Sequence, residues 1–312
     1  MNTIVITLFA VLSLFWFLGK AADLAIYHIR QIAEKLGVGV FFLGLILGFF
    51  TSLPEFAIGI NAVIDGIPSV AFGNLLGGLL TLYGLILGVS LLLNRRIEMG
   101  ESVKRFALIL IFLALPVLLS LDGKLGMIDG IVIAAAYFGL LFVLYEHKRD
   151  VRTTTQDIHR HAIMKDFMLF SVGIILVLII ANFIVDIIKP ILVQLPISPF
   201  VMGLIFFAIG TNFPEIIVTF RAWKSHSKEL AISNLLGSGM ANVMILGVLA
   251  ITQEFPVVRD ASYYSFAVIV AGLLITLFVF YRSNKELTAR EGMILIGIYG
   301  FFVLTQILAT LI

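Results

Sequence analysis

Long apolar stretches separated by short polar ones run through the whole chain. A helix needs about 20 apolar residues to cross the hydrocarbon core of a bilayer, and ten stretches of the sequence meet this requirement. We therefore expect ten transmembrane helices. Their approximate ranges are 3–24, 37–63, 70–93, 104–121, 127–146, 166–189, 199–221, 229–252, 261–281 and 292–312.

The composition narrows the class of protein. Of the 312 residues, 61% are hydrophobic and 13% are charged, whereas soluble domains carry about 25% charged residues. A secretory signal has basic residues before its apolar run, and the first apolar run of this chain has none. We therefore read this run as a transmembrane helix that the mature protein keeps. We expect an all-α integral protein of the cell membrane that works as a monomer in the lipid bilayer.

Several functions are disfavoured by what the sequence lacks. The chain has no cysteine, which excludes disulfides, thiol chemistry and cysteine–zinc sites. No nucleophile–base pair or cofactor motif occurs in the spanning stretches, and no loop is long enough for an ATPase module. We therefore expect no enzyme activity, no cofactor and no nucleic-acid partner.

Basic residues divide unevenly between the two sets of connecting stretches. Those that follow the odd-numbered helices hold 18 of the 21 lysines and arginines, and the others hold only Lys124, Lys189 and Arg259. The positive-inside rule places the first set in the cytoplasm. Both termini are then expected outside the cell.

The two halves of the chain repeat one pattern. Thr51-Ser52-Leu53-Pro54-Glu55 recurs 160 residues later as Thr211-Asn212-Phe213-Pro214-Glu215, and Gly73-Asn74-Leu75-Leu76-Gly77 recurs at the same offset as Ser233-Asn234-Leu235-Leu236-Gly237. Because each half has five helices, the second half enters the membrane from the opposite side. We therefore expect two inverted-topology repeats, residues 1–146 and 166–312, joined by a cytoplasmic linker over 147–165. In transporters of this architecture the substrate site lies near the membrane midplane, where interrupted helices of the two repeats meet.

Glu55 and Glu215 are the candidate ligands at that meeting point. An ionisable side chain at membrane depth is costly and marks a functional site, and the adjacent prolines break the helices and free carbonyls of the preceding turn, around Gly48 and Ala208. Thr51 and Thr211 add hydroxyl oxygens. Oxygen ligands without histidine or cysteine suit hard cations such as Ca²⁺. One divalent ion, two or more sodium ions or two protons could neutralise the pair.

These paired blocks resemble the alpha-repeats of the cation/calcium exchanger superfamily. The chain is most similar to the short prokaryotic sodium/calcium exchangers, and the resemblance extends over its whole length. It implies a central calcium site made by Glu55 and Glu215, with oxygens from Thr51 and Thr211, and flanking sodium sites that share the glutamates. It also implies that the first and sixth helices slide over the remaining core to switch access.

The resemblance carries over unevenly to the flanking sites. One matches position by position, with the Ala208 carbonyl, Thr211, Ser238 and Ser52. On the other side Gly78 and Asn212 stand where serines are expected, and Leu82 stands where an asparagine is expected. Asn242, the counterpart of Leu82, is an amide where some family members carry aspartate. These departures leave open an altered stoichiometry, a proton as counter-ion or a different cation.

The sequence thus predicts a secondary active antiporter that exchanges Ca²⁺ for Na⁺ by alternating access. The alternative is an H⁺/Ca²⁺ exchanger, or an exchanger of another divalent ion such as Mn²⁺ or Mg²⁺, that uses the same two glutamates. A further rival is a sensor or scaffold that binds a cation without transporting it. The candidate ligands of the transported ions are Glu55, Glu215, Thr51, Thr211, Ser52, Ser238, Ala208, Asn212, Asn242 and Gly48.

Overall fold

The computed structural model describes residues 2–35, 40–98, 102–146, 160–194, 197–212, 215–216, 219, 228–284 and 286–311. Within these ranges the chain is almost entirely helical. The helices are α1 (Asn2–Lys35), α2 (Val40–Thr51), α3 (Leu53–Ile64), α4 (Pro68–Leu80), η1 (Thr81–Ile86), α5 (Leu87–Asn94), α6 (Val103–Leu119), η2 (Ser120–Asp122), α7 (Met127–Glu146), α8 (Arg160–Gln194), α9 (Pro199–Met202), η3 (Gly203–Phe207), α10 (Ala208–Thr211), α12 (Lys228–Thr252), α13 (Ala261–Asn284) and α14 (Ala289–Leu311).

The described residues hold nine helical stretches long and apolar enough to cross a membrane. They correspond to nine of the expected spans. The remaining one, expected over 199–221, begins with the shorter apolar stretch Pro199–Thr211. Pro214, where we expected its helix to break, lies outside the described residues.

The helices α1 and α8 extend well past their expected ends. They are 34 and 35 residues long, and α8 begins at Arg160, inside the stretch expected to be linker. The prediction stopped each helix at its charged residues. In the structure these charges pair across the two helices: Nδ1 of His28 lies 2.8 Å from Oδ1 of Asp166, and Lys35 donates to the other Asp166 oxygen. A charge with a partner on the neighbouring helix does not end its own helix.

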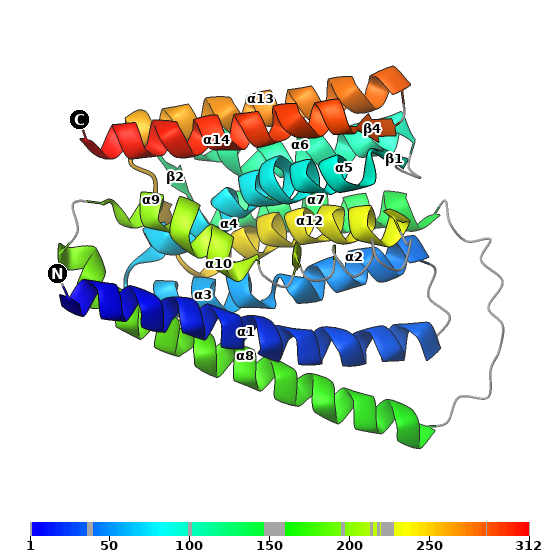
Figure 1. The fold of residues 1–312 in the computed structure, drawn as a ribbon, viewed down its shortest axis with the longest axis horizontal. Coiled ribbons are helices and arrows are strands. Elements are labelled where there is room, and N and C mark those ends of the chain that lie inside the picture. Colours follow the sequence, from blue (N-terminus) through cyan, green and yellow to red (C-terminus); the bar gives the residue numbers. More distant parts are fainter. Residues whose placement is uncertain are drawn as a thin grey trace.

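Two helices form one side of the bundle. Figure 1 shows α1 and α8 running side by side, with α2 and α3 next to them, α4 and α12 in the middle, and α13 and α14 on the far side. Both termini lie at the same end of the bundle. The residues flanking the helix break between α2 and α3 are therefore enclosed between the α1–α8 pair and the middle helices.

Two short sheets close the ends of the bundle. At one end β1 (Arg96–Glu98) pairs antiparallel with β4 (Glu286–Thr288), with Ile97 opposite Leu287. At the end that holds the termini, β2 (Lys124–Leu125) pairs antiparallel with β3 (Phe255–Pro256), with Leu125 opposite Phe255. Each sheet therefore joins a strand of the first half to a strand of the second.

Glycines let the interrupted helices approach the middle helices closely. A Cβ on Gly48 of α2 would lie 2.5 Å from the backbone nitrogen of Ser238 on α12. A Cβ on Gly77 of α4 would lie 2.2 Å from the carbonyl oxygen of Leu204 on η3. Neither position has room for a side chain, so the backbones themselves form the contact. This packing brings backbone carbonyls and polar side chains of α2 and α12 together in the interior.

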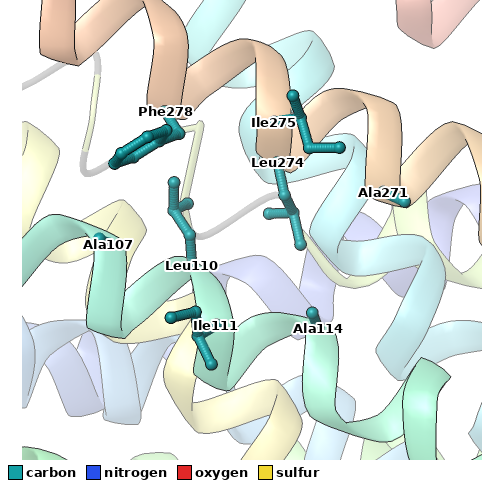
Figure 2. A pocket seen from close by; sticks show the side chains of 8 residues that line it. All are labelled: Ala107, Leu110, Ile111, Ala114, Ala271, Leu274, Ile275 and Phe278. Carbon is teal, nitrogen blue, oxygen red and sulfur yellow. The ribbon is translucent and has the colours of Figure 1, made fainter.

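An apolar groove lies between α6 and α13. Figure 2 shows its lining, which is entirely aliphatic and aromatic, and its volume is about 370 Å³. Ile111 and Ile275 on its rim are 61% and 64% exposed, as expected for side chains that face lipid tails. The groove offers no oxygen ligand and is unsuited to a cation. The polar site lies elsewhere, at the helix break.

Candidate cation site

The second transmembrane stretch is interrupted at Ser52. Helix α2 ends at Thr51, α3 begins at Leu53, and Pro54 occupies the first turn of α3. Proline is favoured there because a first-turn residue needs no intrahelical donor. The break places Glu55 in the first turn of α3, where unpaired backbone N–H groups favour a negative charge. The predicted interruption at Pro54 is thus present in the structure.

The second half is interrupted at the matching position. Helix α10 ends at Thr211, and Asn212 follows with φ −79° and ψ 11°, nearly the same as the −82° and 10° of Ser52. Ile216 then donates to the Asn212 carbonyl at 3.2 Å, as Phe56 donates to that of Ser52 at 3.0 Å. The backbone that presents Glu215 therefore matches the backbone that presents Glu55.

Both glutamates are completely buried and face each other's half of the protein. The Glu55 carboxyl lies near the hydroxyl of Thr211, while the Glu215 carboxyl lies near Thr51, Ser238 and Glu55 itself. Their four carboxyl oxygens have no well-formed hydrogen bond to any described residue. Two adjacent carboxylates without partners in a low-dielectric interior are strongly unfavourable. A bound cation or a proton resolves that cost.

Hydroxyl groups surround the Gly48 carbonyl on the Glu215 side. Thr51, Ser52 and Ser238 donate to this oxygen at 3.0, 3.1 and 3.2 Å, and the hydroxyls of Thr51 and Ser238 are 2.8 Å apart. All three side chains are fully buried. The cluster collects four oxygens, three of them on rotatable groups, beside a carboxylate.

Amide groups dominate the Glu55 side. Asn212 donates through Nδ2 to the Ala208 carbonyl at 2.7 Å, and Thr211 donates to Oδ1 of Asn74 at 3.2 Å. A Cβ on Gly78 would lie 2.5 Å from Nδ2 of Asn242, so the Asn242 amide fills the space beside this glycine. Both polar atoms of Asn242 lack hydrogen-bond partners within the described part of the chain.

The family resemblance implied that Ser52 and Ser238 share a flanking site with Thr211 and the Ala208 carbonyl. In the structure both serines donate to the Gly48 carbonyl. The reason is packing: α12 lies directly against α2, so Ser238 faces the carbonyl of the first half. All ten candidate residues are nonetheless buried around the two helix breaks.

One further buried hydroxyl, not among the candidate residues, follows Glu215 in the sequence. Thr219 is 1% exposed, and its Oγ1 lacks a hydrogen-bond partner among the described residues. It stands four residues after Glu215, a spacing that puts two side chains on the same helix face. That spacing was the signal available in the sequence. Asn74 also reaches the helix break, where its Oδ1 accepts a hydrogen bond from the Thr211 hydroxyl.

The ligand set fits a hard cation. The described residues contain no cluster of three or more histidine, cysteine or acidic side chains, so the site has two formal charges and otherwise neutral oxygens. Ca²⁺ takes 6–8 oxygen ligands from carboxylates, carbonyls and other groups. The carboxyl, hydroxyl and carbonyl oxygens around the two breaks supply this chemistry.

Comparison with known proteins identifies the family to which this chain belongs. The sequence model described as "Sodium/calcium exchanger protein" matches residues 5–146 and 165–308. The chain belongs to the sodium/calcium exchanger family. The family consists of membrane transporters that exchange cations, not of enzymes, and the exchanger described here is accordingly a multi-pass membrane protein.

Individual relatives cover nearly the whole exchanger. It is 26% identical to "Sodium/calcium exchanger MaX1" of Methanosarcina acetivorans, over 92% of this chain and 94% of that protein. It is also 26% identical to "Uncharacterized membrane protein MJ0091" of Methanocaldococcus jannaschii, over 86% and 88%. A solved structure of the sodium-calcium exchanger NCX_Mj has the same fold, with a TM-score of 0.71 and 24% identity over 95% of this chain and 98% of that one.

If the exchanger binds a divalent cation between its two glutamates, neutralising either one weakens binding. We expect Glu55→Gln and Glu215→Gln each to lower Ca²⁺ affinity more than about tenfold, because each variant removes one of only two ligand charges. Equilibrium binding of radioactive calcium to the purified protein measures this. Glu254→Gln is the control, since Glu254 is exposed and pairs with Lys124 at the end of the bundle. Unchanged affinity in both buried variants would place the calcium elsewhere.

Proposed function

We propose that this exchanger is a secondary active antiporter that moves Ca²⁺ in one direction and Na⁺ in the other across the cell membrane by alternating access. The observation that carries the proposal is the pair of buried carboxyls, Glu55 and Glu215, whose four oxygens have no hydrogen-bond partner among the described residues. The names of the sodium/calcium exchanger relatives support the two ions.

The charge of the site gives a reason for exchange rather than a one-way flow. Two carboxylates carry a formal charge of −2, and a buried charge of that size is costly to carry through the membrane unless a cation offsets it. One Ca²⁺ neutralises the pair, and so do Na⁺ ions on the same oxygens. Because both ions need the same ligands, binding of one excludes the other. Only a protein with a neutralised site then changes between the state open to the outside and the state open to the cytoplasm.

Inverted repeats, each with five spanning helices, are part of the proposal. The two sheets support them, because β1 and β3 follow corresponding helices of the two halves and each pairs with a strand of the other half. The matching backbone at Ser52 and Asn212 supports them as well. Residues 1–146 would form the first repeat, 147–165 the connection and 166–312 the second repeat.

We also propose that α1 and α8 move together against the rest of the bundle. They contact each other along their lengths, and Gly173 of α8 lies so close to Ala25 of α1 that a Cβ there would meet its backbone nitrogen at 2.7 Å. Against the core, α1 inserts the ring of Phe15 over Gly210, next to the helix break. Sliding of this ring relative to Gly210 would open or cover the site.

Protons are the second candidate counter-ion. On the Glu55 side the Ala208 carbonyl accepts from the Asn212 amide, and no serine hydroxyl stands at Gly78. That side therefore has fewer hydroxyl oxygens than the Glu215 side, although Oδ1 of Asn212 and of Asn242 have no hydrogen-bond partner among the described residues. A carboxyl with few ligands is neutralised most simply by a proton, and the same two glutamates would then exchange H⁺ for Ca²⁺.

A flux assay separates these possibilities. In proteoliposomes we expect an imposed Na⁺ gradient to drive uptake of radioactive calcium, and a pH gradient alone to drive none, because Na⁺ and Ca²⁺ compete for one set of ligands. Calcium uptake driven equally well by pH without sodium would contradict sodium coupling. The Gln variants of Glu55 and Glu215 serve as controls; flux unaffected by both would indicate a binding protein that does not transport.

The orientation in the membrane is testable because the chain contains no cysteine. Arg96 in β1 and Lys124 in β2 lie at opposite ends of the bundle and are exposed. The excess of basic residues predicts that the β1 end is cytoplasmic and that both termini are outside. A membrane-impermeant maleimide added to intact cells should therefore label Lys124→Cys and not Arg96→Cys. The opposite labelling pattern would invert the orientation.

A further inference from the structure

The two sides of the cation site are built from corresponding positions with different chemistry. At the offset of 160, Ser52 corresponds to Asn212 and Ser238 to Gly78. The Glu215 side therefore carries two serine hydroxyls where the Glu55 side carries one amide and no side chain. The backbone angles at Ser52 and Asn212 are nearly identical, so these two positions differ in their side chains.

The hydroxyl side can adapt to a cation. Thr51, Ser52 and Ser238 all donate to the Gly48 carbonyl. A hydroxyl rotates freely, and each one has two lone pairs besides its proton. When a cation enters, the three groups can turn their protons away and present oxygen, and the Gly48 carbonyl becomes a fourth ligand. The adjacent Glu215 carboxylate supplies the charge.

On the amide side, amide nitrogens lie against the carbonyl oxygen and in the space beside it, while Oδ1 of Asn212 and of Asn242 have no hydrogen-bond partner among the described residues. Nδ2 of Asn212 donates to the Ala208 carbonyl at 2.7 Å, so an N–H group points at the oxygen that corresponds to the Gly48 carbonyl. An amide nitrogen has two donors and no acceptor, and its hydrogens repel a cation. The Asn242 side chain then fills the space left by the absent side chain of Gly78, because its Nδ2 lies 2.5 Å from where a Cβ would be. Nδ2 of Asn212 borders the same space at 3.6 Å.

We propose that the Asn212 and Asn242 amides occupy the space of a monovalent cation on the Glu55 side, so that only the Glu215 side keeps a Na⁺ pocket in addition to the shared site between the two glutamates, where the carboxylate charges are offset. This inference rests on the proposed sodium/calcium exchange and specifies its stoichiometry. The exchanger then moves fewer Na⁺ per Ca²⁺ than it would with hydroxyls on both sides. The net charge moved in each exchange cycle then changes with the number of Na⁺ ions, and so does the dependence of exchange on membrane voltage.

Restoring the hydroxyls on the Glu55 side tests this inference. We compare the wild type with Asn212→Ser and with Asn212→Ser/Gly78→Ser, which rebuilds the serines found at 52 and 238. The side chain added at Gly78 meets the end of the Asn242 side chain, which can rotate away. Na⁺ is titrated against bound radioactive calcium on the purified protein. We expect the double variant to displace calcium more steeply, by about one additional Na⁺, because a further set of oxygen ligands becomes available.

The mirror-image variant gives the matched control. Ser52→Asn/Ser238→Gly places the amide arrangement on the Glu215 side and should make the Na⁺ displacement curve shallower than in the wild type. Ser171→Ala should leave the curve unchanged, because the Ser171 hydroxyl lies on α8 and donates to the Phe167 carbonyl of its own helix. A purely structural role for Asn212 would alter protein stability and calcium affinity without changing the steepness.

Transport measurements give an independent readout. In proteoliposomes the membrane potential at which net calcium flux stops reports the number of Na⁺ ions coupled to each Ca²⁺. We expect this potential to shift in the double variant in the direction that corresponds to more Na⁺ ions per Ca²⁺. If the double variant does not fold, Asn212→Ser alone should shift the potential in the same direction. Equal steepness and equal reversal potential in the wild type and the serine variants would overturn the inference. Absence of any Na⁺ effect in the wild type, with calcium still bound, would instead contradict the proposed sodium exchange itself.

Discussion

Repulsion between two buried carboxyls is the constraint on which the rest of this structure depends. Glu55 and Glu215 have no exposed surface and no well-formed hydrogen bond within the described chain. Removing a carboxylate from water costs several kcal/mol even after the protein relaxes, and like charges nearby increase that cost. Such a pair is stable only with a cation or a proton, so the folded protein must hold one or the other at these carboxyls. In the proposed exchange, cargo binding and charge neutralisation are therefore the same event.

The backbone around this pair is arranged to expose oxygen. Each helix is interrupted shortly before its glutamate, and the carbonyls of the preceding turn, those of Gly48 and Ala208, accept hydrogen bonds from side chains. Glycines such as Gly48 and Gly77 allow the interrupted helices to contact α12 and α4 backbone to backbone. A larger residue at Gly48 would separate α2 from α12 and pull the Ser238 hydroxyl away from the Gly48 carbonyl. Close packing is thus a condition for assembling the site.

The sequence predicted the features that depend on periodicity and duplication. Apolar stretches of spanning length, the repeat of the Pro-Glu blocks and the burial of both glutamates could be read from residue order, because membrane depth restricts where charge and proline occur. The true ends of α1 and α8 could not be read this way, since Asp166 pairs with His28 and Lys35 only through tertiary contact.

The grouping of the ligands also depended on the three-dimensional structure. The family resemblance implied a site that holds Ser238 together with Ser52, Thr211 and the Ala208 carbonyl. The packing of α12 against α2 also brings Ser238 to Thr51 at 2.8 Å, a contact that residue order alone does not give. The sequence comparison of the halves did show that Gly78 and Asn212 depart from their counterparts. It could not show that the Asn242 side chain fills the space beside Gly78, which is a contact between helices.

The central claim is that one divalent cation binds between Glu55 and Glu215, and locating that ion tests it most directly. Crystals of the exchanger soaked in Sr²⁺ without Na⁺ can be measured at a wavelength where strontium scatters anomalously. We expect an anomalous peak within coordination distance of both carboxyls and of the Thr51 and Thr211 oxygens. A protein that binds Sr²⁺ in solution but shows its peak away from these two glutamates would contradict the claim.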